Sequence, residues 1–500
     1  MRVLLINSNQ RDDALAAPPL GLCYVAGAAE AAGHEVRVLD LCFQKSVRLS
    51  LARALAGFAP EVVGVSLRNL DNCNLLYPIS YLPEVRRLMG HLRELTGAPI
   101  VVGGSGASLC PREVLEYLQG DYIVVSDGEL SFVQFLTVLG KGGTPANIPG
   151  VGLQLAGRFH LTPPHLHAFP DGNPRLGRWI DMAPYEKIGS AYTVQTKRGC
   201  RQSCIYCTYN QVLEGKRFRL RSPLEVVDEL EEALHRYHPQ SFEFVDSVFN
   251  DPIDHCLEIL AEICRRPWKA RFSAMGVSPR NLNRELLDLM QRAGFKSFMT
   301  SPESASETML QNYQKGFTAE EVRRAAETVN QSRLPVVWFF LLGGPGETND
   351  TLQETLDFIS QRLSRRNGPP LNLAYPFLGV RIYPGTKLWD IAAQQGFVGP
   401  GSNPLEQLWY LSPGLDLDKA VWQLRQAARH CPEITLTYIE RYLPLITRFL
   451  GILGNFLYIP KPYWQHLPKL QGWLGSQRLR FQPSPARTAA RLRAALGRRC

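Results

Sequence analysis

The sequence predicts an α/β protein with two parallel sheets and a C-terminal helical region. Three observations carry this prediction: Val- and Ile-rich runs alternate with helical segments over residues 1–141, six strand-then-helix units follow over residues 191–400, and residues 401–500 lack strand patterns. Continuous apolar runs are typical of parallel strands covered on both faces. We therefore expect a doubly wound, Rossmann-like domain, then a partial (β/α)6 barrel, then helices.

Composition indicates an ordinary folded protein of two or three domains. The chain has 500 residues, of which 45% are hydrophobic and 20% charged. Its formal net charge is +9, but residues 471–500 hold seven Arg and no acid, which leaves +2 for the rest. The basicity therefore belongs to a tail. A solvated tail is the favoured interpretation, nucleic acid is not expected as a partner, and contact with a membrane surface stays open.

The first domain contains five short apolar runs separated by helical sequence. These runs are RVLLIN at 2–7, EVRVLDL at 35–41, EVVGVSL at 61–67, PIVVGG at 99–104 and YIVVSDGE at 122–129. The segment 18–33 predicts a helix that ends at Gly33. Residues 142–190 are rich in Pro and Gly, so we expect a linker with irregular or short β structure.

The barrel units begin at residue 191. Their strands are expected in YTVQTK at 192–197, SFEFVD at 241–246, KARFSA at 269–274, FKSFMT at 295–300, PVVWFFLLG at 335–343 and LAYPFLGVRIY at 373–383. Ser222 with Pro223 predicts one helix start, and the sequence TAEE at Thr318 predicts a capping box at another. In barrels of this kind the chemistry lies at the carboxyl ends of the strands.

The C-terminal region contains an apolar stretch at 442–459, about as long as a membrane span. It includes Arg448 and two glycines. Buried helices or a substrate lid is the main interpretation, and a segment lying at a membrane interface is the alternative.

Three cysteines lie within eight positions in KRGCRQSCIYCTYN, residues 197–210. A structural zinc site needs four ligands, but after Cys200, Cys204 and Cys207 the next cysteines, Cys256 and Cys264, stand about 50 residues away. The 11 cysteines are scattered and no signal peptide is apparent, which favours a reducing cytoplasm over a disulfide framework. Three thiolates suit an iron–sulfur cubane with one open iron, although zinc stays an alternative at this point.

The CxxxCxxC motif, with Tyr206 before its last Cys, resembles the radical S-adenosylmethionine (SAM) superfamily. It also follows the first barrel strand, as in that family. The resemblance implies a [4Fe-4S] cluster held by Cys200, Cys204 and Cys207, with the open iron binding SAM. It also implies an electron donor such as flavodoxin or ferredoxin.

Several strand ends are similar to the SAM-contacting positions of the family. By this resemblance, FVDSVFN would present Asp246 and Asn250 toward the methionyl part, and TSPESAS, similar to G-x-E-S-G-S, would present Glu303 near the ribose or amine. LLGGPGET resembles the turn whose glycines let the backbone approach adenine. Each motif also has a plain structural explanation as a turn or a helix cap. The implied SAM site comprises Tyr206, Asp246, Asn250, Glu303, Gly344, Pro345 and Gly346.

The first domain resembles the cobalamin-binding domain that precedes many radical SAM barrels. The loop after its first strand lacks G-x-G-x-x-G, which disfavours NAD. PPLGL, GHEVRVLD, VGVSLRN, VVGG and SDGE carry the resemblance, and Ser126 and Asp127 depart from the family's G-E-G-E. No Asp-x-His-x-x-Gly occurs, so the resemblance implies cobalamin without a histidine below cobalt. The implied cobalamin site comprises Ser66, Arg68, Asn69, Gly103, Gly104, Ser105, Gly128 and Glu129.

Arg68 has two competing interpretations. In the first, its cation faces the lower side of cobalt and resists a sixth ligand. In the second, Arg68 forms a salt bridge with Asp71.

The two resemblances together imply a methyltransferase acting on an unactivated carbon. One SAM would give the 5′-deoxyadenosyl radical that removes hydrogen, and a second would recharge cobalamin with the methyl group that the substrate radical takes. Cyclisation, oxidation or rearrangement without net methylation, polar methyl transfer, and a non-catalytic cobalamin-responsive binding protein stay open, whereas methylthio transfer is disfavoured. The expected substrate is a small molecule, with a lipid-like compound as one option.

Overall fold

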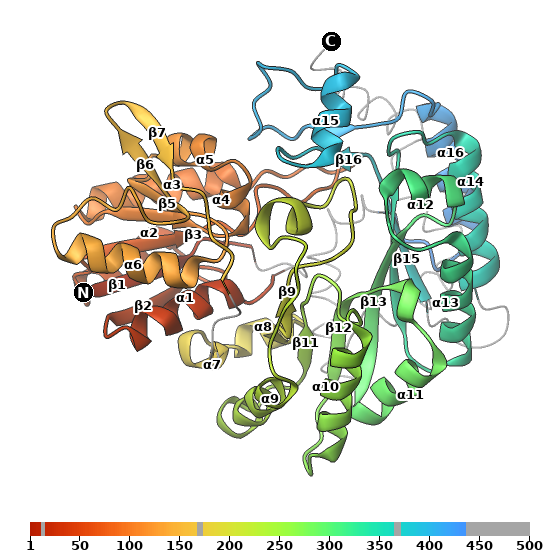
Figure 1. The fold of residues 1–500 in the computed structure, drawn as a ribbon, viewed down its shortest axis with the longest axis horizontal. Helices are drawn as coiled ribbons and strands as arrows, with labels where there is room; N and C mark the ends of the chain where they lie inside the picture. The colour runs from red at the N-terminus through yellow and green to blue at the C-terminus, as the bar shows by residue number, and fades with distance from the viewer. Residues whose placement is uncertain (12–15, 168–173, 365–371, 437–500) are drawn as a thin grey trace.

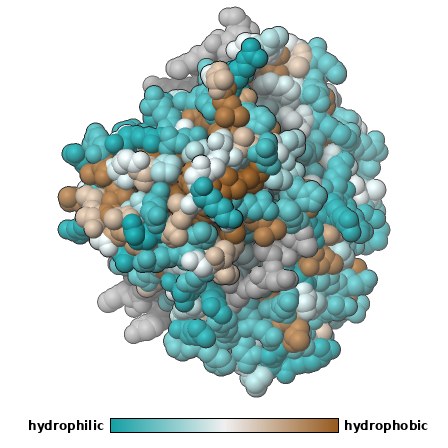
Figure 2. Space-filling view, turned by 60° about the vertical axis from the view of Figure 1, so that its left-hand side comes forward, coloured by the Kyte–Doolittle hydropathy of each residue, from teal (hydrophilic) through white to brown (hydrophobic). Residues whose placement is uncertain are grey.

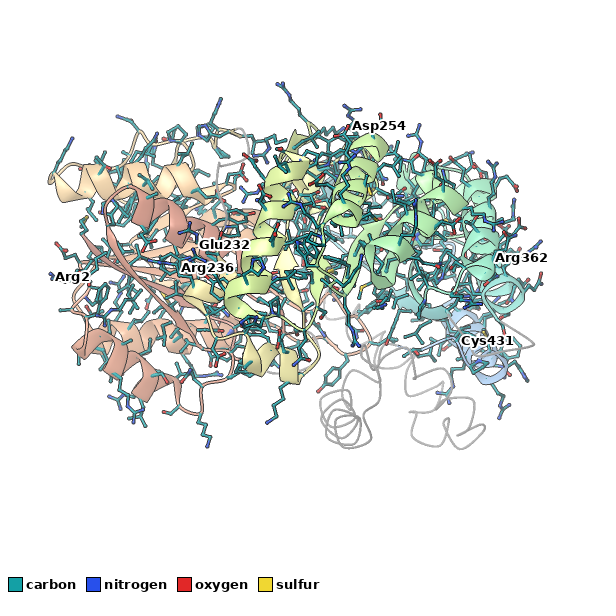
Figure 3. The ribbon with its side chains drawn as sticks, turned by 90° about the horizontal axis from the view of Figure 1, so that it is seen from below. Arg2, Glu232, Arg236, Asp254, Arg362 and Cys431 are labelled. Carbon is teal, nitrogen blue, oxygen red and sulfur yellow. The ribbon has the colours of Figure 1, made fainter. Side chains whose placement is uncertain are left out.

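Two parallel sheets, one in each half of the chain, organise the molecule (Figure 1). The computed structural model describes residues 1–11, 16–167, 174–364 and 372–436. In Figure 3, Arg2 of the first domain and Arg362 of the barrel half lie at opposite ends of the molecule. The expected division into a doubly wound domain and a barrel is confirmed.

The first sheet has the strand order β2-β1-β3-β4-β5-β6-β7. Its strands are β1 (Arg2–Asn7), β2 (Glu35–Asp40), β3 (Val62–Ser66), β4 (Ile100–Gly103), β5 (Tyr122–Val124), β6 (Val151–Leu155) and β7 (Arg158–Leu161). The first five pair in parallel. Their order places the topological switch between β1 and β3, where open α/β sheets bind ligands beyond the strand ends.

Helices cover both faces of this sheet, which explains its apolar runs. They are α1 (Leu20–Ala31), α2 (Val47–Ala56), α3 (Leu82–Leu95), α4 (Ser105–Leu109), α5 (Pro111–Leu118) and α6 (Gly128–Gly140). Leu4 and Ile6 of β1 pack in one core with α2, α3 and α5. Val3 and Leu5 pack in the other with α1 and α6. Alternate β1 side chains therefore serve two separate cores.

The segment expected to be a linker contributes to the first sheet. β6 and β7 form an antiparallel hairpin, and β6 also pairs with β5. The short helices α7 (Leu176–Trp179) and α8 (Ala183–Lys187) then lead to the barrel. The expected short β structure thus extends the edge of the first domain.

The second sheet has six parallel strands in the order β15-β14-β13-β12-β11-β8. They are β8 (Tyr192–Val194), β11 (Phe242–Phe244), β12 (Phe272–Val277), β13 (Phe295–Glu303), β14 (Val336–Leu342) and β15 (Asn372–Leu378). The outer helices are α9 (Pro223–Tyr237), α10 (Ile253–Arg265), α11 (Arg284–Ala293), α12 (Glu307–Tyr313), α13 (Ala319–Gln331) and α14 (Asn349–Phe358), with a 3-10 turn at Pro279–Asn281 and π-helical turns at Tyr209–Leu213 and Ile359–Leu363. Each strand matches one of the six predicted segments.

The predicted helix starts are present. α9 begins directly after Ser222 with Pro223 in its first turn, although the Ser222 side chain makes no capping bond. At Thr318 both bonds of the capping box with Glu321 are formed.

The described part of the C-terminal region continues the barrel edge. β16 (Val380–Arg381) and α15 (Lys387–Gln394) end the barrel segment, and the described part of the C-terminal region contains β17 (Trp409–Tyr410) and α16 (Leu417–His430). The apolar stretch at 442–459 and the basic tail lie outside the described residues. Within the described ranges, no helix is long and apolar enough to cross a membrane. Hydrophobic side chains gather near the middle of the face in Figure 2, whose periphery is mainly hydrophilic.

The two halves meet through buried polar contacts as well as apolar ones. Arg381 of β16 donates from Nε to Asp71 of the first domain at 2.9 Å, and both side chains are almost fully buried. Tyr383 donates to the same carboxylate at 3.4 Å. Because Asp71 already has these partners, and no ion pair involving Arg68 is present among the described residues, the expected alternative of an Arg68–Asp71 salt bridge is wrong.

Candidate functional site

A cavity of about 1230 Å³ lies between the carboxyl end of the first sheet and the interior of the barrel. Its lining includes the loops after β1 and β3 on one side and the cysteine loop on the other. The cavity therefore joins the two places where these folds keep their ligands.

All three cysteines of the motif line this cavity. The loop that carries them needs glycine at Gly199, where φ is +90° and a Cβ would lie 2.2 Å from the carbonyl oxygen of Arg217. Gln211 holds the loop from within, because its Nε2 donates to the carbonyls of Cys204 and Cys207 at 2.8 and 3.1 Å. Its Oε1 accepts from the backbone of Lys387 at 2.9 Å. The loop is thus tied to the first residue of α15.

Burial raises the pKa of two of the three motif thiols. Burial raises the pKa of Cys200 to about 12 and that of Cys207 to about 11, so binding iron must displace protons. In the described part of the chain, no three His, Cys, Asp or Glu side chains converge on a point that would hold one metal ion. In a cubane each thiolate would bind a different iron, so the three cysteines need not converge on one point.

Tyr206, Glu303 and Lys315 form a buried polar group beside the cysteines. The Tyr206 hydroxyl donates to Glu303 Oε1 at 2.8 Å, and Lys315 Nζ lies 3.0 Å from that hydroxyl and 3.4 Å from Oε1. Burial raises the pKa of Glu303, although Lys315 opposes the rise. Burial would lower the pKa of Lys315, but Cys204 and Glu303 raise it. The group offers a cation, a carboxyl and a phenol to one ligand.

Glu303 adopts a backbone conformation that favours glycine. Its φ is +69° at the end of β13, a conformation that non-glycine residues adopt rarely and often at functional sites. The turn brings the carboxylate to Tyr206 across the cavity rim.

The polar side-chain atoms of Asp246 and Asn250 form hydrogen bonds with backbone groups of the protein. Asp246 accepts from the backbone of Thr196 and Lys197 at 2.7 and 3.1 Å, which fixes the entry to the cysteine loop. Asn250 is fully buried and exchanges two hydrogen bonds with the backbone of Ser278. Asp246 lines the cavity, whereas Asn250 does not.

The Gly-Pro-Gly turn, residues 344–346, packs against α12. Its residues are not among those that line the cavity. A Cβ on Gly344 would lie 2.3 Å from the Tyr313 hydroxyl, to which the Gly344 amide donates at 3.1 Å. Asn312 donates to the carbonyl of Pro345 at 3.0 Å. Gly346 has φ +80° and faces the Asn312 side chain. The close approach that the motif allows is therefore made by the protein's own side chains, and a contact with adenine stays a prediction.

On the first domain, the predicted cobalamin positions gather around the ends of β3 and β4. Ser66, Arg68, Asn69, Gly103, Gly104, Ser105, Gly128 and Glu129 all line the cavity. Gly104 has φ +100°, and a Cβ there would lie 2.5 Å from the Leu67 carbonyl oxygen. Ser105 Oγ donates to the Arg68 carbonyl at 2.7 Å. These contacts hold the two loops together at the switch point.

A branch of the cavity enters the first domain beside Gly64. There, Leu5, Val101 and Phe132 line it, and a Cβ on Gly64 would meet Leu5 Cδ2 at 2.6 Å. This apolar slot suits the nucleotide tail of a corrin. None of the described residues that line the cavity is a histidine, and the absence of a histidine below cobalt stays a prediction.

Arg68 projects from the first domain toward the barrel. Burial raises the pKa of Tyr209 and Glu243, and the positive charge of Arg68 opposes each rise. Glu243, on β11, lines the cavity and accepts from Ser273 Oγ at 3.2 Å. Sequence reasoning missed Glu243, Gln211 and Lys315, because none belongs to a recognisable motif. The alternation of strand β11 was the one available signal for Glu243.

Two family models match the chain. The one described as the B12 binding domain matches residues 13–136, and the one described as the Radical SAM superfamily matches residues 194–359. The chain is a radical SAM protein with a B12-binding domain. Its cofactors are a [4Fe-4S] cluster, SAM and cobalamin.

Several named proteins and solved structures are similar to this chain over most of its length. An uncharacterised methyltransferase of Pyrococcus horikoshii is 25% identical, and the aligned region covers 75% of this chain and 78% of the relative. Tryptophan 2-C-methyltransferase of Streptomyces laurentii is 25% identical, and the aligned region covers 76% of this chain and 73% of the relative. The structure of a radical SAM methyltransferase from Kitasatospora setae, with cobalamin and a [4Fe-4S] cluster bound, has a TM-score of 0.80 at 24% identity and covers 99% of both chains. At this identity the structural likeness shows the shared fold.

Proposed function

We propose that this protein is a cobalamin-dependent radical SAM methyltransferase that methylates an unactivated carbon of a small molecule. The observation that carries the proposal is the single cavity, which is lined by the cysteines on the barrel side and by Arg68 and Gly104 on the cobalamin side. A substrate in this space would meet both cofactors without leaving the protein, and positioning of this kind supplies much of a rate enhancement.

The residues divide the work of binding and positioning. When bound, the cluster and SAM supply a radical that removes a hydrogen atom, and cobalamin supplies the methyl group. Cys200, Cys204 and Cys207 would hold the cluster. Lys315 and Glu303 would bind the carboxylate and the amine or ribose of SAM, because they offer opposite charges beside the cysteines.

Support for the remaining sites differs from residue to residue. We assign Asp246 to holding the cysteine loop, since its oxygens already accept backbone hydrogen bonds there. Asn250 and the Gly344–Gly346 turn would support the SAM site from behind, because they lie outside the described lining. Ser66, Asn69, Gly103, Gly104 and Ser105 would contact the corrin.

The barrel interior favours a substrate with an apolar body and one hydrogen-bond donor. Met275, Met299 and Phe339 line this part of the cavity. Glu243 adds one carboxyl whose pKa burial raises. A lipid-like substrate, a flavodoxin- or ferredoxin-type electron donor and a peripheral membrane contact remain proposals of lower rank, since no contact in the described residues supports them.

Anaerobic product analysis tests the proposal. The protein would be reconstituted with iron, sulfide and hydroxocobalamin, reduced with titanium(III) citrate, and incubated with methyl-deuterated SAM and a small-molecule extract. We expect 5′-deoxyadenosine, S-adenosylhomocysteine and a product heavier by one deuterated methyl group. A product of any other mass change would favour cyclisation, oxidation or rearrangement, and S-adenosylhomocysteine with methylated product but no 5′-deoxyadenosine would favour polar transfer.

A matched pair of cysteine variants separates the cluster from general effects. Cys204→Ala removes one predicted ligand and should abolish 5′-deoxyadenosine formation. Cys264→Ala changes a half-buried cysteine on the outer helix α10 and should retain it. Equal activity of both variants would contradict the assigned cluster site.

A further inference from the structure

Two arginines face each other at the base of the cysteine loop. This base, the strand pair at residues 197–198 and 219–220, is here called the neck. β9 (Lys197–Arg198) and β10 (Arg219–Leu220) form a short antiparallel pair whose register places Arg198 opposite Arg219. Residues 199–218 lie between these strands and include all three cysteines. Like charges directly opposite one another destabilise a strand pair. The neck therefore needs negative charge from elsewhere.

That negative charge comes from the cobalamin-binding domain. Arg198 donates to Asp127 Oδ1 at 3.1 Å and to Glu129 Oε1 at 2.6 Å. Arg219 forms a charged hydrogen bond with the other oxygen of Asp127. Asp127 thus lies between the two cations, and together with Glu129 it balances their two positive charges.

These charges are hidden from solvent. The four side chains are between 6% and 11% exposed. Burial alone would raise the pKa of Glu129, but Arg198 outweighs this effect and lowers it. At such burial the removal of one partner leaves a charge without compensation, and that is far more costly than the loss of a surface pair.

Other contacts join the same turn to the same loop. Ser126 Oγ donates to the Leu213 carbonyl at 2.8 Å. The Arg198 guanidinium also lies over the ring of Tyr24 on α1, 5.2 Å from its centroid. The acidic turn, residues 126–129, therefore contacts the neck and the end of the cysteine loop.

We propose that Asp127 and Glu129 are positioning residues that hold the cysteine loop in its cluster-binding form. Docking of the cobalamin-binding domain and binding of the cluster then stabilise each other, as linked equilibria must. This inference goes beyond the proposed methyl transfer, because it concerns assembly of the cluster site. It also gives Glu129, which was expected to contact cobalamin, a role toward Arg198.

The test measures how fast the reconstituted full-length protein loses its cluster to the iron chelator bipyridyl. Asp127→Asn and Glu129→Gln keep side-chain size and remove one charge. We expect cluster loss at least about tenfold faster in each, since an uncompensated buried charge costs more than a tenfold change requires. Neither residue contacts the predicted cluster ligands. A wild-type rate of cluster loss in both variants would overturn the proposal.

A second substitution tests the charge balance by the direction of its effect on the rate of cluster loss. In the Asp127→Asn background, Arg219→Met removes one of the two opposed cations and leaves Arg198 paired with Glu129. We expect the double variant to lose its cluster more slowly than Asp127→Asn alone. A double variant that is as fast or faster would show ordinary additive damage and would refute the charge balance.

Two further measurements keep the outcome readable. Glu30→Gln removes one partner of the exposed Arg178–Glu30 pair between α1 and α7, and it should leave the rate unchanged. If Asp127→Asn takes up too little iron to time its loss, iron content per chain replaces the rate. Recovery of iron in the double variant supports the proposal, and an equal deficit overturns it. None of these readouts depends on methyl transfer.

Discussion

Lys315 is a buried cation beside the cysteine motif that the sequence did not point to. It follows α12, is 5% exposed and lies within 3.4 Å of both Tyr206 and Glu303. A buried lysine is tolerated only where negative charge compensates it. SAM brings a carboxylate, and the cysteine thiolates bring further negative charge, so Lys315 fits a role in holding both.

Lys315→Met should therefore weaken SAM binding. We expect 5′-deoxyadenosine formation at subsaturating SAM to fall by about tenfold or more, because the buried Glu303 loses its cation. Lys315→Arg keeps the charge and should retain part of the activity. Chromatography with mass detection measures the product, and an unchanged rate in Lys315→Met would refute this role.

Glu347, in the Gly-Pro-Gly-Glu turn, should make stability depend on pH. Burial raises its pKa from 4.5 to about 7, and its Oε2 accepts from the Gly343 amide at 2.7 Å. Because the folded-state pKa is the higher one, its contribution to stability is fully present below about pH 4.5 and is lost as pH rises through about 7.

Glu347→Gln should remove this loss. The variant should unfold at a higher temperature than wild type at pH 8, by an amount worth up to about 3 kcal/mol, and should differ little at pH 5. Thermal unfolding at the two pH values measures the effect, with the exposed Glu320→Gln as the control. An equal shift at both pH values would contradict the assignment.

Arg68→Ala tests the position of Arg68 relative to cobalt. If its guanidinium lies below cobalt, removing it would open the lower face to a ligand, and we expect the visible and paramagnetic resonance spectra of bound cob(II)alamin to change. The variant should still bind cobalamin, because Gly103, Gly104 and Ser105 remain. Unchanged spectra with unchanged activity would rule out a contact with cobalt.

At the scale of elements, the cysteine loop depends on one side chain. Gln211 lies in the π-helical turn Tyr209–Leu213 and bonds to carbonyls of the motif and to the amide of Lys387. Gln211→Leu leaves these groups without a partner, at a cost of roughly 1–3 kcal/mol for each buried group.

We therefore expect Gln211→Leu to lower the iron content after reconstitution while leaving cobalamin binding intact. Colorimetric iron and absorbance of cobalamin give the two values from one sample. Gln211→Glu tests the acceptor separately, because it keeps the oxygen facing Lys387. A full complement of iron in Gln211→Leu would contradict the role given to this residue.

The strands and the cysteine motif could be predicted from sequence because their signals are local. Apolar runs mark each parallel strand, and CxxxCxxC marks its loop. The partners of Glu129 and Asp71 could not be predicted, since Arg198 and Arg381 lie in the other half of the chain and pair with them only after the two halves dock. Likewise, Lys315 reaches the motif through the turn after α12, which periodicity does not specify.

At the scale of the whole molecule, two separate sets of buried ion pairs join the domains. One links Arg198 and Arg219 to the acidic turn, and the other links Arg381 to Asp71. Both link the loops around the cavity rather than distant surfaces. We infer that the cofactor sites are held at one separation while the substrate is bound.

If one cavity brings both cofactors to one substrate, methyl transfer needs both cofactors in the same protein molecule. The most direct measurement is product formation from deuterated SAM by protein loaded with cluster and cobalamin together, with cluster alone, or with cobalamin alone. The account predicts the deuteromethylated product only when both are present. The same product from protein that lacks either one would contradict it.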